Sequence, residues 1–165
     1  MNLDRILPGS TVFIDTNLLI YSRRAKSQEA IRLLRSCAAS LVQGVITTIV
    51  LAEYSHRMMM IECKEMGIAG TNPARTMSER PALVRSLSSY ADDVRQILNG
   101  GLHCEPVLPG DFLAALEIQS QFGLLTNDSL NLAVARRLGI KEFATADPNF
   151  DQVQGLVIYK PSDII

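Results

Sequence analysis

The chain has 165 residues, of which 47% are hydrophobic and 20% are charged, and its formal net charge is −1. This length fits one compact domain, 1–165, and no apolar stretch is long enough to cross a membrane. A net charge so close to zero gives no general attraction to phosphate, so contact with a nucleic acid would need local cations or a bound metal.

The N-terminal sequence and the cysteines bear on the cellular compartment. MNLDRILPGS has no basic stretch followed by an apolar run and a small-residue cleavage site, so we expect no secretory signal. Cys37, Cys63 and Cys104 are odd in number and form no CxxC pair, which argues against a disulfide framework or a thiolate zinc site. We expect a cytoplasmic protein with reduced thiols.

The first half of the chain alternates strand and helix patterns. TVFI is short, apolar and β-branched, and it lies between a Pro-Gly pair and a polar triplet, as expected for a buried strand. Helical spacing of apolar residues follows it. The predicted elements, in order, are a strand at 11–14, a helix at 26–41, a strand at 45–46 and a helix at 49–61.

Residues 62–80 interrupt this alternation. They are polar and collect Gly67, Gly70, Asn72 and Pro73, so we predict a loop or an insertion within the domain. Periodic patterns then resume, and the glycines at 100, 101 and 139 indicate where two helices end. The predicted elements here are a helix at 84–98, a strand at 105–108, helices at 111–122 and 127–139, and strands at 142–145 and 156–159.

Strands that alternate with helices predict right-handed crossovers and a mostly parallel sheet. We therefore expect an α/β fold with three layers, α/β/α, around four or five strands. In such sheets, functional residues gather where strands end and the strand order switches.

Four acids either lie at such positions or lie where a solvent-exposed side chain is not expected. Asp15 and Asp147 each follow a predicted strand, although a lone acid there could simply cap the next helix. Asp128 lies at a predicted helix start, where backbone N–H groups favour an anion. Glu53 is the only acid in TTIVLAEYSHRMMMI and shares a helix face with apolar residues. A carboxylate on a buried face needs a metal, hydrogen bonds or an ion pair with an arginine.

If the strands are neighbours, these acids converge on one crevice. Packed carboxylates raise one another's pKa unless cations neutralise them. A cluster of oxygen ligands without thiolates suits hard ions such as Mg²⁺ or Mn²⁺, which retain water and accept phosphate oxygens.

Four motifs occur in a fixed order: FIDTNLLIY (13–21), LAEY (51–54), LLTNDSLNLAVARRLGI (124–140) and FATADPNFDQV (143–153). With them the chain resembles the PIN-domain nucleases, most closely the VapC-type toxins of toxin–antitoxin pairs, over nearly its whole length. The resemblance implies a PIN-like fold. By position, the family's four acids match Asp15, Glu53, Asp128 and Asp147, and its supporting polar residues match Asn17 and Thr145.

The resemblance also implies a function, a cofactor and partners. The activity would be that of an endoribonuclease dependent on Mg²⁺ or Mn²⁺, with the aspartates as metal ligands and Glu53 as a ligand or water-orienting base. Asn17 and Thr145 would orient them. An antitoxin protein and a second copy of the chain would be partners, with 58–61 and parts of 62–98 as the homodimer interface, because three methionines and an isoleucine in a row cannot all face one core.

Other interpretations stay open. Tyr21, Arg23, Arg24 and Lys26 follow Asp15 and either contact RNA or form a solvated helix end. One rival function is that of a haloacid-dehalogenase-type phosphatase, which also has an Asp after its first strand, but this chain has Asn17 where that chemistry needs a second Asp. The other is a non-catalytic PIN-like module that binds RNA or protein.

Overall fold

The computed structural model describes residues 1–68 and 72–164. Its centre is a sheet of five parallel strands in the order β3-β2-β1-β4-β5. The strands are β1 (Thr11–Ile14), β2 (Gln43–Thr47), β3 (His103–Glu105), β4 (Glu142–Ala144) and β5 (Val157–Tyr159). The α/β prediction is confirmed. β1 lies in the middle, with strands that follow it in the chain on either side.

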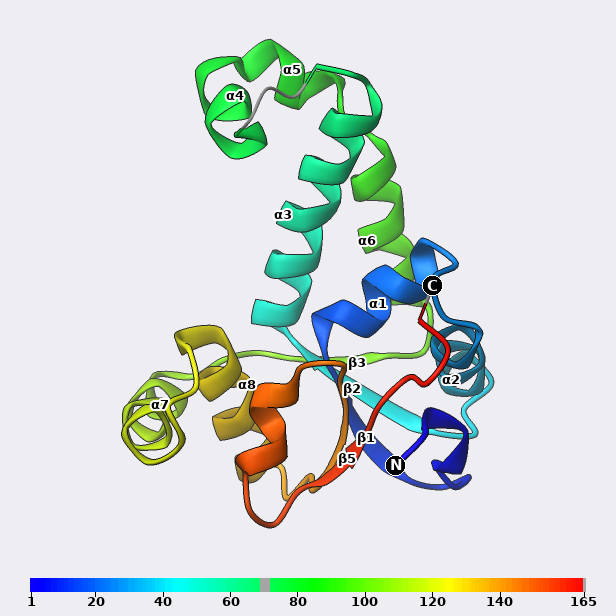
Figure 1. Ribbon diagram of the computed structural model, residues 1–165, viewed down its shortest axis with the longest axis vertical. Coiled ribbons are helices and arrows are strands. Elements are labelled where there is room, and N and C mark those ends of the chain that lie inside the picture. The colour runs from blue at the N-terminus through cyan, green and yellow to red at the C-terminus, as the bar shows by residue number, and fades with distance from the viewer. Residues whose placement is uncertain (69–71, 165) are drawn as a thin grey trace.

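Helices flank the sheet: α1 and α2 lie on one side of it and α7 and α8 on the other (Figure 1). The helices are α1 (Thr16–Arg23), α2 (Gln28–Ala38), α3 (Thr48–Glu65), α4 (Pro73–Glu79), α5 (Pro81–Ser86), α6 (Ser89–Asn99), α7 (Pro109–Phe122) and α8 (Thr126–Arg137). Two 3₁₀ helices, Leu3–Arg5 and Pro148–Gln152, complete the described elements. α3 and α6 extend away from the sheet and carry α4 and α5 at their far end (Figure 1).

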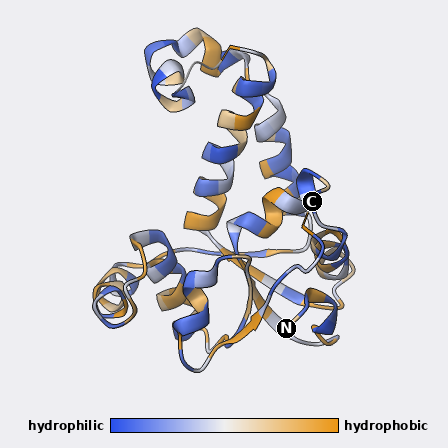
Figure 2. Ribbon diagram, viewed as in Figure 1, coloured by the Kyte–Doolittle hydropathy of each residue, from blue (hydrophilic) through white to orange (hydrophobic). Residues whose placement is uncertain are grey.

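The main core lies between the sheet and these helices. Hydrophobic residues concentrate along the strands, whereas the projecting helices alternate hydrophobic and hydrophilic residues (Figure 2). Phe13 of β1 stacks on Phe143 of β4 with ring centroids 4.7 Å apart, and Phe143 contacts Phe150 at 5.4 Å. These contacts fix β4 beside β1, which matters because the candidate acids follow these two strands.

For 62–80, the sequence predicted a loop or an insertion within the domain, and the loop alternative is largely wrong. α3 continues to Glu65 and ends before Gly67, whose φ is +69°, and α4 begins at Pro73 with Asn72 accepting a hydrogen bond from the Arg75 N–H at 3.1 Å. Residues 69–71 of this prediction lie outside the described residues. The helices here pack around a second small core of Cys63, Met77, Leu83 and Leu87. The glycine and proline content favoured a loop because it gives no information about this tertiary contact.

The predicted helix at 84–98 is divided in two. α5 ends at Ser86 and α6 begins at Ser89, and the Glu62 carboxylate accepts hydrogen bonds from the backbone N–H groups of Ser88, Ser89 and Tyr90. These groups are the donors that a helix start leaves unsatisfied. A side chain from α3 thus caps α6. The sequence of 84–98 alone could not predict this break, because the capping residue lies outside that segment.

Two further boundaries differ from the predictions. β3 is at His103–Glu105 and not at 105–108, because its register against β2 pairs Val45 with His103 and Pro106 has no N–H for the ladder. α1 was not predicted as a helix. It begins directly after Asp15, whose side chain accepts the Thr16 N–H at 2.6 Å.

The apolar run at 58–61 is divided between two cores and is only partly buried at 59–61. Met58 is buried in the main core, Ile61 packs against that core, and Met59 and Met60 pack against the second core. These contacts account for much of the apolar run without a second copy of the chain, and the homodimer interface at 58–61 and parts of 62–98 stays a prediction. Among the described helices, none is both long and apolar enough to span a membrane. The three cysteines are free thiols.

Candidate active site

The carboxyl ends of β1 and β4 lie next to each other at the point where the strand order switches. β4 pairs with β1 so that Ala144 is opposite Ile14, and the residues that follow, Thr145 and Asp15, continue side by side. A cleft at this edge is lined by residues of both strand ends and of α3 and α8. All four predicted acids are among them: Asp15, Glu53, Asp128 and Asp147.

The Asp15 carboxylate is held on both oxygens. Oδ1 accepts the Thr16 N–H at 2.6 Å, while Oδ2 accepts the Asn17 amide at 2.5 Å and the Thr145 hydroxyl at 2.6 Å. Its side chain is buried. Three hydrogen bonds leave this carboxylate one orientation, toward the cleft.

Asn17 and Thr145 also join the two strand ends to each other. The Asn17 carbonyl oxygen accepts the Ala146 N–H at 3.0 Å, and the Thr145 hydroxyl oxygen accepts the Asp147 N–H at 3.0 Å. The loop that carries Asp147 is thereby tied to the start of α1. The two residues predicted to support the acids therefore contact Asp15 directly and fix the backbone of Asp147.

Glu53 reaches the cleft from the first turns of α3. Thr47 fixes the start of that helix, because its hydroxyl accepts the Val50 N–H at 3.1 Å and donates to the Asn131 side chain at 2.6 Å. The expectation of a buried apolar face is wrong, since Glu53 is only partly buried and forms an ion pair with Arg57 at 2.8 Å. The alternative of an arginine partner is the one observed, yet Glu53 and Arg57 both line the cleft.

Asp128 lies in the first turn of α8, where its charge is the least compensated of the four acids. Burial, followed by the charges of Asp15 and Asp147, raises its pKa to about 6, and Arg57 opposes the shift. Burial also raises the pKa of Asp15 above its usual range, against the hydrogen bonds from Thr145 and Thr16. The acids therefore repel one another across the cleft, and a cation would relieve this repulsion.

The donor set fits a hard cation that keeps part of its water. The lining supplies carboxylate oxygens, and the buried Thr16 hydroxyl beside Asp15 has no hydrogen-bond partner among the described residues. No group of three acid, histidine or cysteine side chains within 1–68 and 72–164 is close enough to hold an ion together. An ion here would contact one or two side chains and retain water ligands, as Mg²⁺ and Mn²⁺ do.

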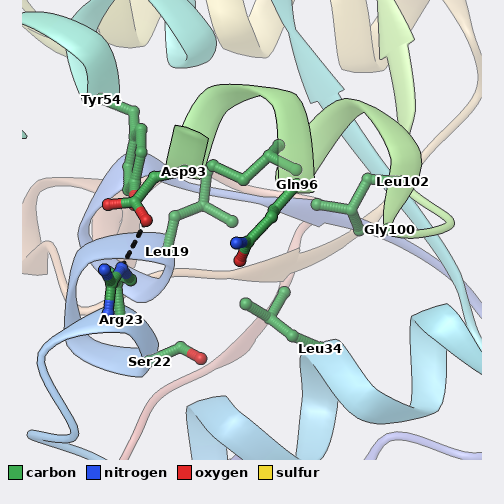
Figure 3. A pocket seen from close by; sticks show the side chains of 10 residues that line it. Leu19, Ser22, Arg23, Leu34, Tyr54, Asp93, Gln96, Gly100 and Leu102 are labelled. Atoms are coloured by element: carbon green, nitrogen blue, oxygen red, sulfur yellow. Dashed lines mark hydrogen bonds and ion pairs between the residues drawn. The ribbon is translucent and has the colours of Figure 1, made fainter. Parts of the chain in front are cut away.

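The residues predicted to contact RNA after Asp15 lie away from this cleft. Arg23 pairs with the buried Asp93 at 2.5 Å, where it lines a separate pocket between α1, α2, α3 and α6 (Figure 3). Arg24 pairs with Glu65 on α3, Tyr21 packs against the core, and Lys26 is exposed. Their contact with RNA stays a prediction, without support from proximity to the acids.

Sequence reasoning missed six residues that line the cleft. Three of them, Leu125, Thr126 and Asn127, immediately precede Asp128, and the others are Arg57, Thr16 and Asn149. The available signal for Arg57 was its position four residues after Glu53, which places both on one helix face. Thr16 and Asn149 gave no signal beyond adjacency to the motifs around Asp15 and Asp147.

A family model of the PIN domain matches residues 12–156, so the chain belongs to the PIN-domain family. No curated protein matches the chain. The match spans all four acids and the strands that carry the cleft.

Three solved structures share the fold at low sequence identity. VapBC2 from Rickettsia felis, bound to a DNA fragment from their promoter, has a TM-score of 0.57 and 16% identity, covering 92% of this chain and 99% of that chain. A toxin–antitoxin complex from Klebsiella pneumoniae has a TM-score of 0.53 and 18% identity, covering 88% and 95%. Mycobacterium tuberculosis VapC20, a toxin that cleaves the sarcin–ricin loop, has a TM-score of 0.59 and 17% identity, covering 87% and 95%.

Proposed function

We propose that the chain is an endoribonuclease that hydrolyses RNA phosphodiester bonds with the help of Mg²⁺ or Mn²⁺. The observation that carries this proposal is the cleft in which Asp15, Glu53, Asp128 and Asp147 come together. A structural ion-pair network would supply as many cations as acids, whereas this lining contains only Arg57 among the described residues. Uncompensated carboxylates at a switch point of a parallel sheet are typical of a metal-dependent site.

The roles follow from how firmly each acid is held. Asp15 has one orientation, so it is the fixed ligand, and Asn17 and Thr145 keep it there. Asp128 on α8 and Asp147 in the loop after β4 would hold the ion directly or through its retained water. Glu53 can accept the proton of an attacking water once its pair with Arg57 opens. A bound divalent ion would supply the positive charge that makes water nucleophilic at neutral pH and stabilises the phosphate.

We further propose that the chain is the toxin of a type II toxin–antitoxin pair and acts in the cytoplasm. Support comes from the similar folds, two of which are a VapBC protein and a toxin–antitoxin complex, and one of which is an RNA-loop-cleaving toxin. The partner would then be an antitoxin protein.

The two rival functions have less support. A non-catalytic PIN-like module would not need the Asp15 carboxylate fixed by three hydrogen bonds at a shared cleft. A haloacid-dehalogenase-type phosphatase would need an acid at position 17, but here Asn17 is bonded at both ends of its amide, to Asp15 and to Ala146.

A homodimer is also part of the proposal, with 58–61 and parts of 62–98 as the predicted interface and α7 as a second exposed surface. α7 exposes Phe112, Leu113 and Leu116, which are 51%, 70% and 62% accessible. An apolar strip of this kind on a helix is typical of an interface. A mass of two chains in light scattering supports the dimer, and a monomer at high micromolar concentration excludes it.

The proposed activity is tested with purified protein and two RNAs, a synthetic sarcin–ricin loop and total bacterial RNA. Cleavage is expected with Mg²⁺ or Mn²⁺ and not with EDTA. The melting temperature should also rise with metal, because an ion at a hundredfold excess over its dissociation constant stabilises the folded state by roughly 2.7 kcal/mol. Equal melting temperatures in all conditions, with no RNA cleaved, would reject the proposal.

A further inference from the structure

One face of α3 connects the acid cleft to the projecting helices. Glu53, Arg57, Met60 and Lys64 follow one another at spacings of four, three and four residues, so they form a single stripe along the helix. Arg57 lines the acid cleft and also the next groove along this stripe. That groove is lined by Ile20, Arg57, Met60, Ile61, Lys64 and Pro73. Arg57 thus borders both depressions.

The charges on this stripe differ from those on the neighbouring side of α3. There, Arg24 pairs with Glu65 and Arg23 with Asp93, so the cations are neutralised within the chain. Lys64 is exposed and makes no ion pair within 1–68 and 72–164. The stripe therefore leads from an acidic cleft to an uncompensated cation.

A polyanionic substrate needs such a stripe. Four carboxylates repel phosphate, and the chain as a whole has a net charge of −1, so the attraction must be local. We propose that the Arg57–Lys64 stripe of α3 holds the RNA strand beside the cleavage site, with Arg57 on the phosphate at the cleft and Lys64 on a phosphate further along. This inference rests on the proposed ribonuclease function and names the residues that bind its substrate.

Arg57 is suited to exchange partners. Its pair with Glu53 spans one helical turn, and its side chain is 49% exposed, so the pair is weak and easily opened. A guanidinium binds phosphate through two parallel N–H groups, which compensates for the loss of Glu53. The exchange also frees the Glu53 carboxylate for water. One movement of Arg57 would bind the substrate and release the proposed base.

The position of Lys64 sets the length of RNA involved. Seven residues separate it from Arg57, which is about 10 Å along a helix at 1.5 Å per residue. At a rise of about 3.4 Å per nucleotide along one stacked strand, this distance corresponds to about three nucleotides. Arg57 should therefore matter for every substrate, and Lys64 only for RNA that extends about three nucleotides past the cut on one side.

The test compares Lys64→Ala with Lys141→Ala, using an RNA that the wild type cleaves. Lys141 is also exposed, but it precedes β4 and so lies at the opposite end of the sheet from the cleft. Lys64→Ala should raise KM about fivefold, with a much smaller change in kcat, and reduce the salt dependence of binding by about one phosphate contact. Lys64→Arg should restore both, and Lys141→Ala should leave both at wild-type values.

A length series completes the test. RNAs that end one, three or six nucleotides beyond the mapped cut, on either side, should show the Lys64→Ala defect only when the strand extends far enough on one side. Equal KM and salt dependence for Lys64→Ala and Lys141→Ala would overturn the inference while the wild type still cleaves RNA. A wild type that cleaves no RNA with Mg²⁺ or Mn²⁺ would instead reject the proposed function itself.

Discussion

The acids of the cleft and the acids around Arg137 are two clusters of one small domain with opposite electrostatics. Arg137 of α8 contacts Asp111 of α7 at 2.8 Å and Glu105 of β3 at 2.7 Å. The hydrogen bond from Arg137 is the main cause that lowers the pKa of Glu105. In the cleft, burial and neighbouring acids raise the pKa of Asp15 and Asp128 instead.

Asp111 shows how the protein stabilises an acid that has a structural role. Burial opposes its charge, but the hydrogen bonds from Arg137 and from the Leu108 N–H outweigh it and lower the pKa. Asp111 thus contributes to stability as an anion, whereas Asp128, at a pKa of about 6, costs stability as one. A carboxylate that the fold leaves uncompensated is the better candidate for function, and the same Asp→Asn change should separate the two kinds.

The largest effect is expected for Asp15→Asn on cleavage. Removing this charge should lower kcat by roughly a hundredfold or more, because the one acid held in a single orientation loses its affinity for a cation. The fold should persist, since the amide keeps the shape and its oxygen can accept the Asn17 and Thr145 hydrogen bonds, while the relief of a buried repulsion offsets the lost bond from the Thr16 N–H. Circular dichroism checks the fold and RNA cleavage the rate. A rate equal to wild type would contradict the assignment of Asp15.

Asp111→Asn should have the next largest effect, on stability. It removes a charge-assisted bond to Arg137, and we expect a loss of roughly 2 kcal/mol at neutral pH. The pKa of Asp111 is lowered by folding, so this stabilisation is full above its unfolded value of 3.8 and disappears as the pH falls through the lower folded value. Urea unfolding at pH 7 and pH 3 measures it. RNA cleavage by the folded variant serves as the control and should be unchanged.

Asp128→Asn should act in the opposite direction and more weakly. The folded pKa of about 6 lies above the model-peptide value of 3.8, so the stability linked to protonation is present below pH 3.8 and is lost as the pH rises through 6. At pH 7.5 in EDTA the variant should be more stable than wild type by on the order of 1 kcal/mol, a figure reduced for solvent screening.

The same variant should respond less to metal than wild type. Added Mg²⁺ or Mn²⁺ should raise the melting temperature of wild type more than that of Asp128→Asn, because the relief of repulsion is already present in the variant. If Asp111→Asn and Asp128→Asn shifted stability in the same direction in EDTA, the contrast between the two clusters would be wrong.

Local sequence patterns were sufficient to predict those elements whose apolar spacing alone defines them. The buried strand before Asp15 and the periodic helix around Leu130 and Val134 came from apolar spacing, and they gave the parallel sheet. The patterns were insufficient where a distant side chain decides. Glu62 divides the 84–98 helix by capping α6, and the contacts of Cys63 with the second core order a segment that glycines made look like a loop.

The sequence by itself determined that Asp15 and Asp147 each follow a strand, and therefore that both lie at the carboxyl edge of a parallel sheet. The spacing of residues along one element determines these placements, whereas the supporting roles of Asn17 and Thr145 came from the resemblance to the PIN-domain family. Only the tertiary structure decided that Arg57 pairs with Glu53 and lines the cleft, that Arg23 and Arg24 are occupied by Asp93 and Glu65, and that Met58 is core. Ion pairing and burial depend on which elements pack against each other. The sequence pattern of one element does not tell which other element contacts it.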